Sequence, residues 1–183
     1  MEYRKLIKLK DGRNCLLRNG TAADGQAVWD SFVLTHAETD FLTTYPDEHS
    51  FTAEQEAVFL QGRTESADEI LILAELEGRV VGTAGIDCVG RKDKLRHRAE
   101  FGISVERACW GLGIGRALMR ACIECARVAG YAQLELSAVA DNEHALALYR
   151  SEGFTEFGRN PRGFRTRGGD WQELVLMRLE LDG

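Results

Sequence analysis

Runs of apolar residues bounded by turn residues predict most of the strands in this chain. Residues 70–76 and 80–89 form two such runs, and Glu77-Gly78-Arg79 between them is typical of a hairpin turn. The same criterion predicts further strands at residues 14–18, 95–105, 131–139, 154–159 and 173–181. The segment 38–50 has no clear periodicity and contains Pro46, so we expect it to be a loop.

Helices are predicted where apolar residues recur at helical spacing after a capping residue. Thr21 and Thr52 each begin a capping box, so we expect helices from these residues to about residues 37 and 64. An apolar stripe predicts a helix that ends near residue 129, and its members are Leu118, Ala121, Cys122, Cys125 and Ala129. A last helix is expected over residues 142–152, with Gly153 as its C-cap. Together the elements predict a single α/β domain over residues 1–183, in which about four helices flank a mixed, mostly antiparallel sheet.

Composition and charge narrow the class of protein. Apolar residues make up 44% of the 183 residues and charged residues 28%, which is ordinary for a globular domain with a full core. A net charge of −6 and a pI near 5.3 argue against nucleic acid as the main partner. The first residues do not resemble a signal peptide, and no run approaches the roughly 20 apolar residues of a membrane span. We therefore expect a cytoplasmic protein with no membrane partner.

The five cysteines are an odd number in a chain for which no export is expected, which indicates reduced thiols. Cys122 and Cys125 are spaced as Cys-x-x-Cys, but they lie on the apolar stripe, and no second pair of ligands completes a zinc site. We expect both to pack in the core, and we expect no metal site. Cys109 lies beside a glycine-rich loop, where it is either buried or exposed and reactive.

This glycine-rich loop, between a predicted strand and a predicted helix, is the clearest chemical signal in the chain. It follows the apolar run at residues 101–105 and reads Gly111-Leu112-Gly113-Ile114-Gly115-Arg116. Glycine permits positive φ angles and a close approach to a ligand, and the N–H groups of a first helical turn point at an anion. The loop therefore predicts a phosphate-binding site.

Three kinds of phosphate loop fit the spacing to different degrees, and a flexible surface turn with incidental glycines is the fourth alternative. A P-loop fails because Arg116 and Ala117 follow Gly115, where Lys and Ser or Thr are needed. A dinucleotide-binding turn is disfavoured, because its third glycine would fall at Arg116 and five residues separate Val105 from Gly111. The spacing Gly-x-Gly-x-Gly favours a loop for the pyrophosphate of coenzyme A.

A second block of residues lies downstream of the loop. After the helix come the strand Leu134-Glu135-Leu136, the block Asn142-Glu143-His144-Ala145-Leu146-Ala147-Leu148-Tyr149, and then Gly153-Phe154. With this order of motifs, the chain resembles the GNAT superfamily of acetyl-CoA-dependent N-acetyltransferases over about residues 69–157. The tail, at residues 160–165 and 171–177, resembles one bacterial branch of that superfamily.

The resemblance implies a seat for acetyl-CoA around the loop. Backbone N–H groups from Leu112 to Arg116 would hold the pyrophosphate, so the whole loop from Gly111 onward is expected to bind the cofactor. The strand backbone at Ile103 and Val105 would pair with the pantetheine and present an N–H to the thioester oxygen. Trp110 stands where the family usually has Arg or Gln, and it either covers the adenine or ribose or is a partly buried core residue.

Acetyl transfer also needs a proton donor for the leaving thiolate. Tyr149 lies two helical turns after Asn142, so both side chains face the same way. The resemblance implies that Asn142 binds the cofactor arm and that Tyr149 reaches the sulfur. A phenol of pKa about 10 is protonated at neutral pH and can donate to a developing thiolate.

The amine needs a base, because an alkyl ammonium of pKa about 10.4 is neutral only about one time in 10³ at pH 7. A carboxylate can remove its proton, directly or through water. Glu100, on the strand that leads to the loop, is our first choice and Glu135 the second. Ser137 occupies a position at which some family members carry a carboxylate, so the resemblance does not single out a base.

These observations predict an acetyl-CoA-dependent N-acetyltransferase, in which a primary amine of a small molecule or a peptide N-terminus attacks directly within a ternary complex. A homodimer is a further expectation. The alternative is a catalytically silent acyl-CoA-binding domain on the same fold, and a nicotinamide-dependent dehydrogenase is a distant third.

The acceptor is suggested only by charge. The N-terminal helical segment is acidic and the last hairpin is basic, so a cleft between them would suit an amino-acid-like zwitterion, unless both are solvated surface. The acids are Asp24, Asp30, Glu38, Asp40, Asp47, Glu48, Glu54 and Glu56, and the bases are Arg159, Arg162, Arg165 and Arg167.

Overall fold

The computed structural model describes residues 1–181, which form eight strands, four α-helices and three short 3-10 turns. The strands are β1 (Arg4–Lys8), β2 (Asn14–Asn19), β3 (Ile70–Leu76), β4 (Arg79–Cys88), β5 (Arg98–Val105), β6 (Gln133–Val139), β7 (Thr155–Arg165) and β8 (Trp171–Glu180). The helices are α1 (Gly25–Ala37), α2 (Ala53–Glu65), α3 (Ile114–Val128) and α4 (Glu143–Ser151), and the 3-10 turns are η1 (Ala22–Asp24), η2 (Pro46–Glu48) and η3 (Arg107–Cys109). None of the helices within these residues combines the length and the apolarity that a membrane crossing requires.

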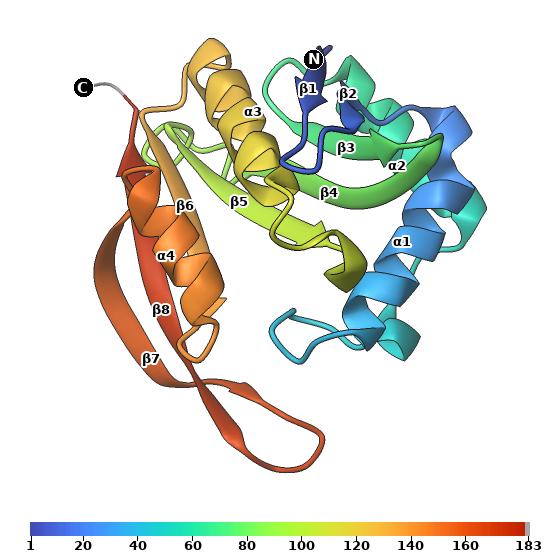
Figure 1. Ribbon diagram of the computed structural model, residues 1–183. Coiled ribbons are helices and arrows are strands. Elements are labelled where there is room, and N and C mark those ends of the chain that lie inside the picture. Colours follow the sequence, from blue (N-terminus) through green and yellow to red (C-terminus); the bar gives the residue numbers. More distant parts are fainter. Residues whose placement is uncertain (182–183) are drawn as a thin grey trace.

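The strands form one sheet in the order β1-β2-β3-β4-β5-β6-β8-β7 (Figure 1). Every neighbouring pair is antiparallel except β5 and β6, which run parallel. The strands from β1 to β5 pair in chain order, whereas β6 pairs with β8 and leaves β7 at the edge. The predicted mixed and mostly antiparallel sheet with four flanking helices is confirmed.

The two faces of the sheet are covered by different helices. Ile72 and Ala74 of β3 belong to the large core under α3 and α4, whereas Leu71 and Leu73 pack on the opposite face against Leu60 of α2. Figure 1 shows α3 and α4 crossing in front of the sheet. Because the central strands are buried on both faces, residues 70–74 of β3 form a continuous apolar run rather than an alternating one.

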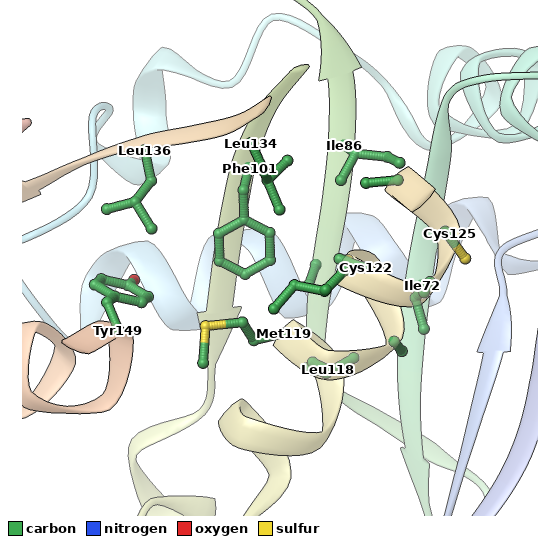
Figure 2. Close-up of a cluster of buried hydrophobic side chains, with 14 of the residues drawn as sticks. Ile72, Ile86, Phe101, Leu118, Met119, Cys122, Cys125, Leu134, Leu136 and Tyr149 are labelled. Carbon is green, nitrogen blue, oxygen red and sulfur yellow. The ribbon is translucent and has the colours of Figure 1, made fainter. Parts of the chain in front are cut away.

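The large core lies beneath α3 and contains the apolar stripe predicted for this helix. Leu118, Met119 and Cys122 are fully buried there (Figure 2). All five cysteines are free, and burial raises the pKa of the Cys125 thiol to about 11, so it stays protonated and packs as a small apolar group. Cys109 is also buried, and burial raises its pKa. Of the two alternatives for Cys109, the structure therefore favours the unreactive buried thiol.

Three elements differ from those predicted. β1 lies outside the predicted strands because its residues are mostly basic and its Leu6 is exposed at the sheet edge, which gives no apolar run. β5 begins at Arg98 because residues 91–97 form a turn, although a strand is expected from residue 95. β7 continues to Arg165 through Pro161, which an edge strand tolerates because it can leave an N–H position unpaired.

Candidate active site

A wedge opens between β5 and β6, the two parallel strands. They pair over only three residues each, from Arg98↔Gln133 to Glu100↔Glu135. Beyond that point β5 stays paired with β4 and β6 with β8, so the two strands diverge (Figure 1). A pocket of about 640 Å³ occupies this wedge and is lined by both strands.

The backbone of β5 presents hydrogen-bonding groups to the wedge. The N–H of Glu106 donates to the carbonyl of Val81 on β4 at 2.9 Å, and residues of an antiparallel strand alternate in direction. The N–H and C=O groups of Ile103 and Val105 therefore point away from β4 and toward the gap, whereas Phe101 still lies at the seam with β6. The carbonyl of Val105 already accepts the indole N–H of Trp110 at 2.7 Å, so its N–H remains for a ligand.

The glycine loop has the conformation that its sequence predicts. Gly111 (φ 77°) and Gly113 (φ 99°) are left-handed, and a Cβ at either would meet nothing within 4 Å, so both face open space. Gly113 is the N-cap of α3, and the first backbone bond of the helix runs from Ala117 N–H to Gly113 C=O at 3.1 Å. The N–H groups of residues 114–116 precede that bond and so have no intrahelical partner. Gly115 has an ordinary helical φ and lines the pocket.

Two cationic side chains line the pocket at this loop. Arg116 is on the first turn of α3 and forms an ion pair with Glu152 at 2.5 Å. Lys10 lies in the turn between β1 and β2, and its backbone N–H donates to the carbonyl of Leu112 at 3.1 Å. Sequence reasoning missed Lys10 because only the tertiary fold brings this turn to the loop. Leu112 itself packs on the core and does not line the pocket, unlike the other residues expected to bind the cofactor.

Asn142 and Tyr149 both line the pocket from α4. Asn142 is the N-cap of the helix, and its Oδ1 accepts the N–H of Ala145 at 3.2 Å, which leaves the side-chain NH₂ as the group free to donate. Tyr149 is 8% exposed, and its ring meets Phe101 edge-on with centroids 6.3 Å apart (Figure 2). Burial raises the pKa of Tyr149 to about 12, so the phenol is protonated at neutral pH.

Trp110 lies at the rim of the pocket rather than in the core. Its side chain is 46% exposed, and the guanidinium of Arg107 lies 5.8 Å from the centre of its ring. The partly buried core alternative for Trp110 is therefore wrong, and the ring is available to cover a ligand.

The two candidate bases differ in position. Glu100 is exposed and lines the pocket, on the face of the sheet opposite to Tyr149, because its neighbours Ala99 and Phe101 point into the core under α3. Glu135 does not line the pocket; it is bound by Arg98, whose Nη2 donates to it at 2.7 Å and which lowers the pKa of Glu135. Of the two candidate bases, Glu100 therefore lies on the pocket wall, where Asp87 of β4 is a second carboxylate, whereas Glu135 is engaged by Arg98 away from the pocket.

The half of the pocket on the face of α1 and α2 is built from residues that carry no sequence motif. Apolar and hydroxyl side chains come from the end of α1, the loop after it and β7, and Asp87 comes from β4; the residues are Thr35, Thr39, Phe41, Leu42, Thr43, Asp87 and Phe164. Ser104 and Ser137 line it from β5 and β6. These positions depend on how distant segments pack, so no local spacing in the chain points to them.

The acidic and basic walls expected for an amino-acid acceptor are not where the charge pattern placed them. None of the eight acids and four arginines named for these walls lines the pocket. Several are paired with one another or with other parts of the fold: Arg167 bonds Asp47 at 2.7 Å, and Asp24 bonds Arg18 at 2.7 Å. That part of the prediction is wrong, because opposite charges on neighbouring segments neutralise each other.

The sequence profile of the Acetyltransferase (GNAT) family matches residues 32–154, a segment that includes the glycine loop, Asn142 and Tyr149. The chain belongs to the GNAT family. The GNAT acetyltransferase of Streptococcus pneumoniae has a similar structure, with a TM-score of 0.87 and 27% identity over 91% of this chain and 99% of that one.

Two curated relatives of this GNAT chain are named as N-acetyl- or N-acyltransferases. The N-alpha-acetyltransferase RimI of Mycobacterium tuberculosis is 42% identical over 93 residues, which are 51% of this chain and 56% of RimI. The L-amino acid N-acyltransferase MnaT of Escherichia coli is 28% identical over 136 residues, which are 74% of this chain and 78% of MnaT. The match thus spans little more than half the length of RimI.

Proposed function

We propose that this GNAT protein is an acetyl-CoA-dependent N-acetyltransferase that acetylates a primary amine by direct attack within a ternary complex. The observation that carries the proposal is the pocket that passes through the sheet between β5 and β6. The glycine loop and Tyr149 line it on one face, and Glu100 lines it on the other. Two substrates can therefore enter from opposite faces, and their reacting atoms can meet in the wedge.

Acetyl-CoA would lie on the face of α3 and α4. The free N–H groups at the start of α3 and the helix dipole would hold the pyrophosphate, and Lys10 and Arg116 would add positive charge there. The pantetheine arm would follow β5 and accept from the N–H of Val105, with the NH₂ of Asn142 donating from the other side and the N–H of Ile103 left for the thioester oxygen. Trp110 would cover the outer part of the cofactor.

In the reaction the amine nitrogen attacks the thioester carbonyl carbon, a C–N bond forms and the C–S bond breaks. The N–H of Ile103 would stabilise the oxyanion. Tyr149 would donate a hydrogen bond to the leaving sulfur. Because its pKa is raised to about 12, it is a weaker acid than a thiol of pKa about 8.5, so hydrogen bonding to the thiolate is favoured over complete proton transfer.

Glu100 would accept the proton of the attacking amine, directly or through a water molecule. Its side chain is exposed on the wall from which the acceptor enters, so proton exchange with solvent is open to it. Solvent would then supply the proton that converts the released thiolate of coenzyme A into its thiol.

The experiment is an acceptor screen with purified protein and acetyl-CoA, in which thiol release and the mass of each product are measured. We expect amine-dependent release of coenzyme A and a product heavier by one acetyl group. Tight binding of acetyl-CoA without amine-dependent release would instead support the silent acyl-CoA-binding alternative. Absence of acetyl-CoA binding in calorimetry would contradict both.

Peptide N-termini and small amines both remain candidate acceptors at this stage, since the names of RimI and MnaT represent different acceptor classes. The homodimer and the cytoplasmic location stay predictions. Light scattering on the purified protein tests the oligomeric state.

A further inference from the structure

The half of the pocket on the face of α1 and α2, which we call the acceptor half, contains two carboxylates. Glu100 of β5 and Asp87 of β4 are partners in the antiparallel register, so their side chains stand on the same face of the sheet, and both line the pocket. The Lys and Arg side chains that line the pocket within residues 1–181 are Lys10 and Arg116, and both belong to the glycine loop end. An acceptor that enters by α1 therefore meets negative charge and no lysine or arginine on the wall.

The arginines nearest to this half are occupied or distant. Arg63 binds Glu69 at 2.9 Å and also Asp87, and it does not line the pocket. Arg107 lies beyond the other end of β5, whose last residue Val105 is about 16 Å along the strand from Glu100 at the usual rise per residue. It lines a neighbouring hollow that shares Thr39, Phe41 and Trp110 with the pocket. Neither guanidinium lines the pocket itself, so neither is expected to hold a carboxylate attached to the carbon that carries the reacting amine.

The rest of this half favours a small apolar body. Phe41, Leu42 and Phe164 supply apolar surface from two segments that are far apart in sequence. These segments are joined by a strap, which we define as the contacts of Arg167 and Gln172 with the loop after α1. The N–H of Arg167 donates to the hydroxyl of Tyr45 at 3.0 Å, and Gln172 Nε2 donates to the carbonyl of Asp40 at 3.2 Å. The strap bounds the space available to a long acceptor.

We infer that the acceptor is a small primary amine with an apolar body and no carboxylate on the amine-bearing carbon, such as an arylalkylamine or an amino-acid amide. The inference rests on the proposed function and narrows it. Its physical basis is that Glu100, together with Asp87 in its ion pair with Arg63, attracts an ammonium group, whereas an α-carboxylate would enter a partly buried space beside these carboxylates with no lysine or arginine on the wall to pair with it. Free L-amino acids, the class in the name of MnaT, are therefore expected to be poor acceptors for this chain.

The test compares three acceptors that share one side chain: phenylalaninamide, phenethylamine and free phenylalanine. We expect kcat/KM for phenethylamine to exceed that for phenylalanine by about tenfold or more, because like charges close together in a partly buried site repel strongly. This comparison is the stricter one, because the amine of phenethylamine is the more basic of the two and so less often neutral. The amide should also be used better than phenylalanine, and its less basic amine adds to that preference. A phenylalanyl-glycyl-glycine tripeptide should be used less well than the amide, because the strap limits length.

A substitution on the pocket wall tests how much its negative charge contributes to this preference. Asp87→Asn removes one carboxylate from the wall and should reduce the amide-to-acid ratio by about threefold or more. Asp93→Asn is the matched control, because Asp93 has a 94% exposed side chain in the turn before β5 and lies outside the pocket. Thermal unfolding of both variants checks that the fold is retained, and Arg107→Gln tests whether this arginine holds a carboxylate after all.

The outcomes separate this inference from the function on which it rests. A preference for the amide that shrinks in Asp87→Asn but not in Asp93→Asn would support the acceptor class. Use of phenylalanine or of the tripeptide as efficiently as the amide would overturn it and leave the acetyltransferase intact, as would loss of phenylalanine turnover in Arg107→Gln. Absence of coenzyme A release with every acceptor would overturn the proposed function itself.

Discussion

The two halves of the pocket meet in one wedge, but they are built in different ways. The half on the face of α3 and α4 uses mainly backbone groups and neighbouring side chains from one stretch of the chain, residues 101–149, with Lys10 as an addition. The half on the face of α1 and α2 uses side chains from α1, the loop after it, and the strands β4, β5, β6 and β7, and the strap joins that loop to the last hairpin. The first half is one supersecondary unit, and the second exists only in the complete fold.

This difference determines how strongly substitutions in the sequence can change each half of the pocket. A site made of backbone N–H groups binds a phosphate whatever the surrounding side chains, provided that glycine remains where φ is positive. A site made of side chains on loops changes with every substitution in them. The cofactor half is therefore expected to be chemically fixed within a fold, and the acceptor half to set what each protein acetylates.

The largest expected effect comes from breaking the backbone site. Gly113→Asp places a Cβ and a negative charge on the loop, so acetyl-CoA affinity measured by calorimetry should fall by at least about 100-fold. Gly130→Asp is the matched control, since Gly130 also has a positive φ of 81°, faces open space and follows the other end of α3. Unchanged affinity in a folded Gly113→Asp protein would show that the loop does not bind the cofactor.

Tyr149→Phe should lower kcat by about 10²-fold, the low end of the range for a lost proton donor, because a hydrogen bond rather than a full proton transfer is removed. Cofactor affinity should stay within a few-fold of the original. Tyr131→Phe is the control, since Tyr131 is also buried and lies outside the pocket. Full activity of Tyr149→Phe would remove this hydroxyl from the mechanism.

Glu100→Gln should lower kcat/KM at pH 7 by about tenfold, because water can replace an exposed base in part. The deficit should shrink toward high pH, where the amine is already neutral and needs no base, and a pH profile of both proteins measures this. Glu135→Gln should reduce the melting temperature through loss of its bond to Arg98 without this pH-dependent deficit. A deficit in Glu100→Gln that is equal at every pH would assign Glu100 to binding rather than proton removal.

Asp24→Asn should leave acetylation kinetics unchanged, because Asp24 belongs to the fold and not to the acceptor site. Arg18 lowers the pKa of Asp24 from 3.8 to about 2. The folded-state pKa is depressed, so this pair stabilises the protein above about pH 4 and the contribution is lost as the pH falls through 2. We expect Asp24→Asn to reduce the free energy of unfolding at pH 7 by about 1–2 kcal/mol and the two stability curves to converge near pH 2.

For Asp24→Asn, chemical denaturation across the pH range gives the stability curves. Asp30→Asn is a suitable control, because Asp30 is exposed and its carboxylate accepts a hydrogen bond from the neutral side chain of Gln26 rather than from a charged group. A changed KM for the acceptor in Asp24→Asn would return this acid to the acceptor site and weaken the contrast between the two halves.

The sequence predicts much of the fold and most of the cofactor half. Continuous apolar runs such as β3 and capping boxes such as that at Thr52 act locally, so their elements lie close to their predicted bounds. The positive φ of Gly111 and Gly113 is likewise a local property of the backbone, and the spacing of the glycines predicts it. β1 could not be predicted from the sequence, because an exposed basic edge strand has no run of apolar residues.

The acceptor half could not be predicted from sequence because its residues meet only through long-range packing. Phe41 and Phe164 are ordinary apolar residues in loop and edge-strand segments, and nothing near either indicates the other. Charge alone was misleading there, since Asp47 and Arg167 neutralise each other across the strap and neither lines the pocket.

The short parallel seam between β5 and β6 also bears on how the chain folds. Only three residue pairs join the strands β1–β5 to the group formed by β6, β8 and β7, and the backbone ladder between these two groups is correspondingly small. In the first group each strand pairs with the strand next to it in the chain, whereas β6 can pair with β5 only after the crossover through α3 has formed. Native-state hydrogen exchange should therefore resolve two cooperative units, with the seam amides opening before the centres of either.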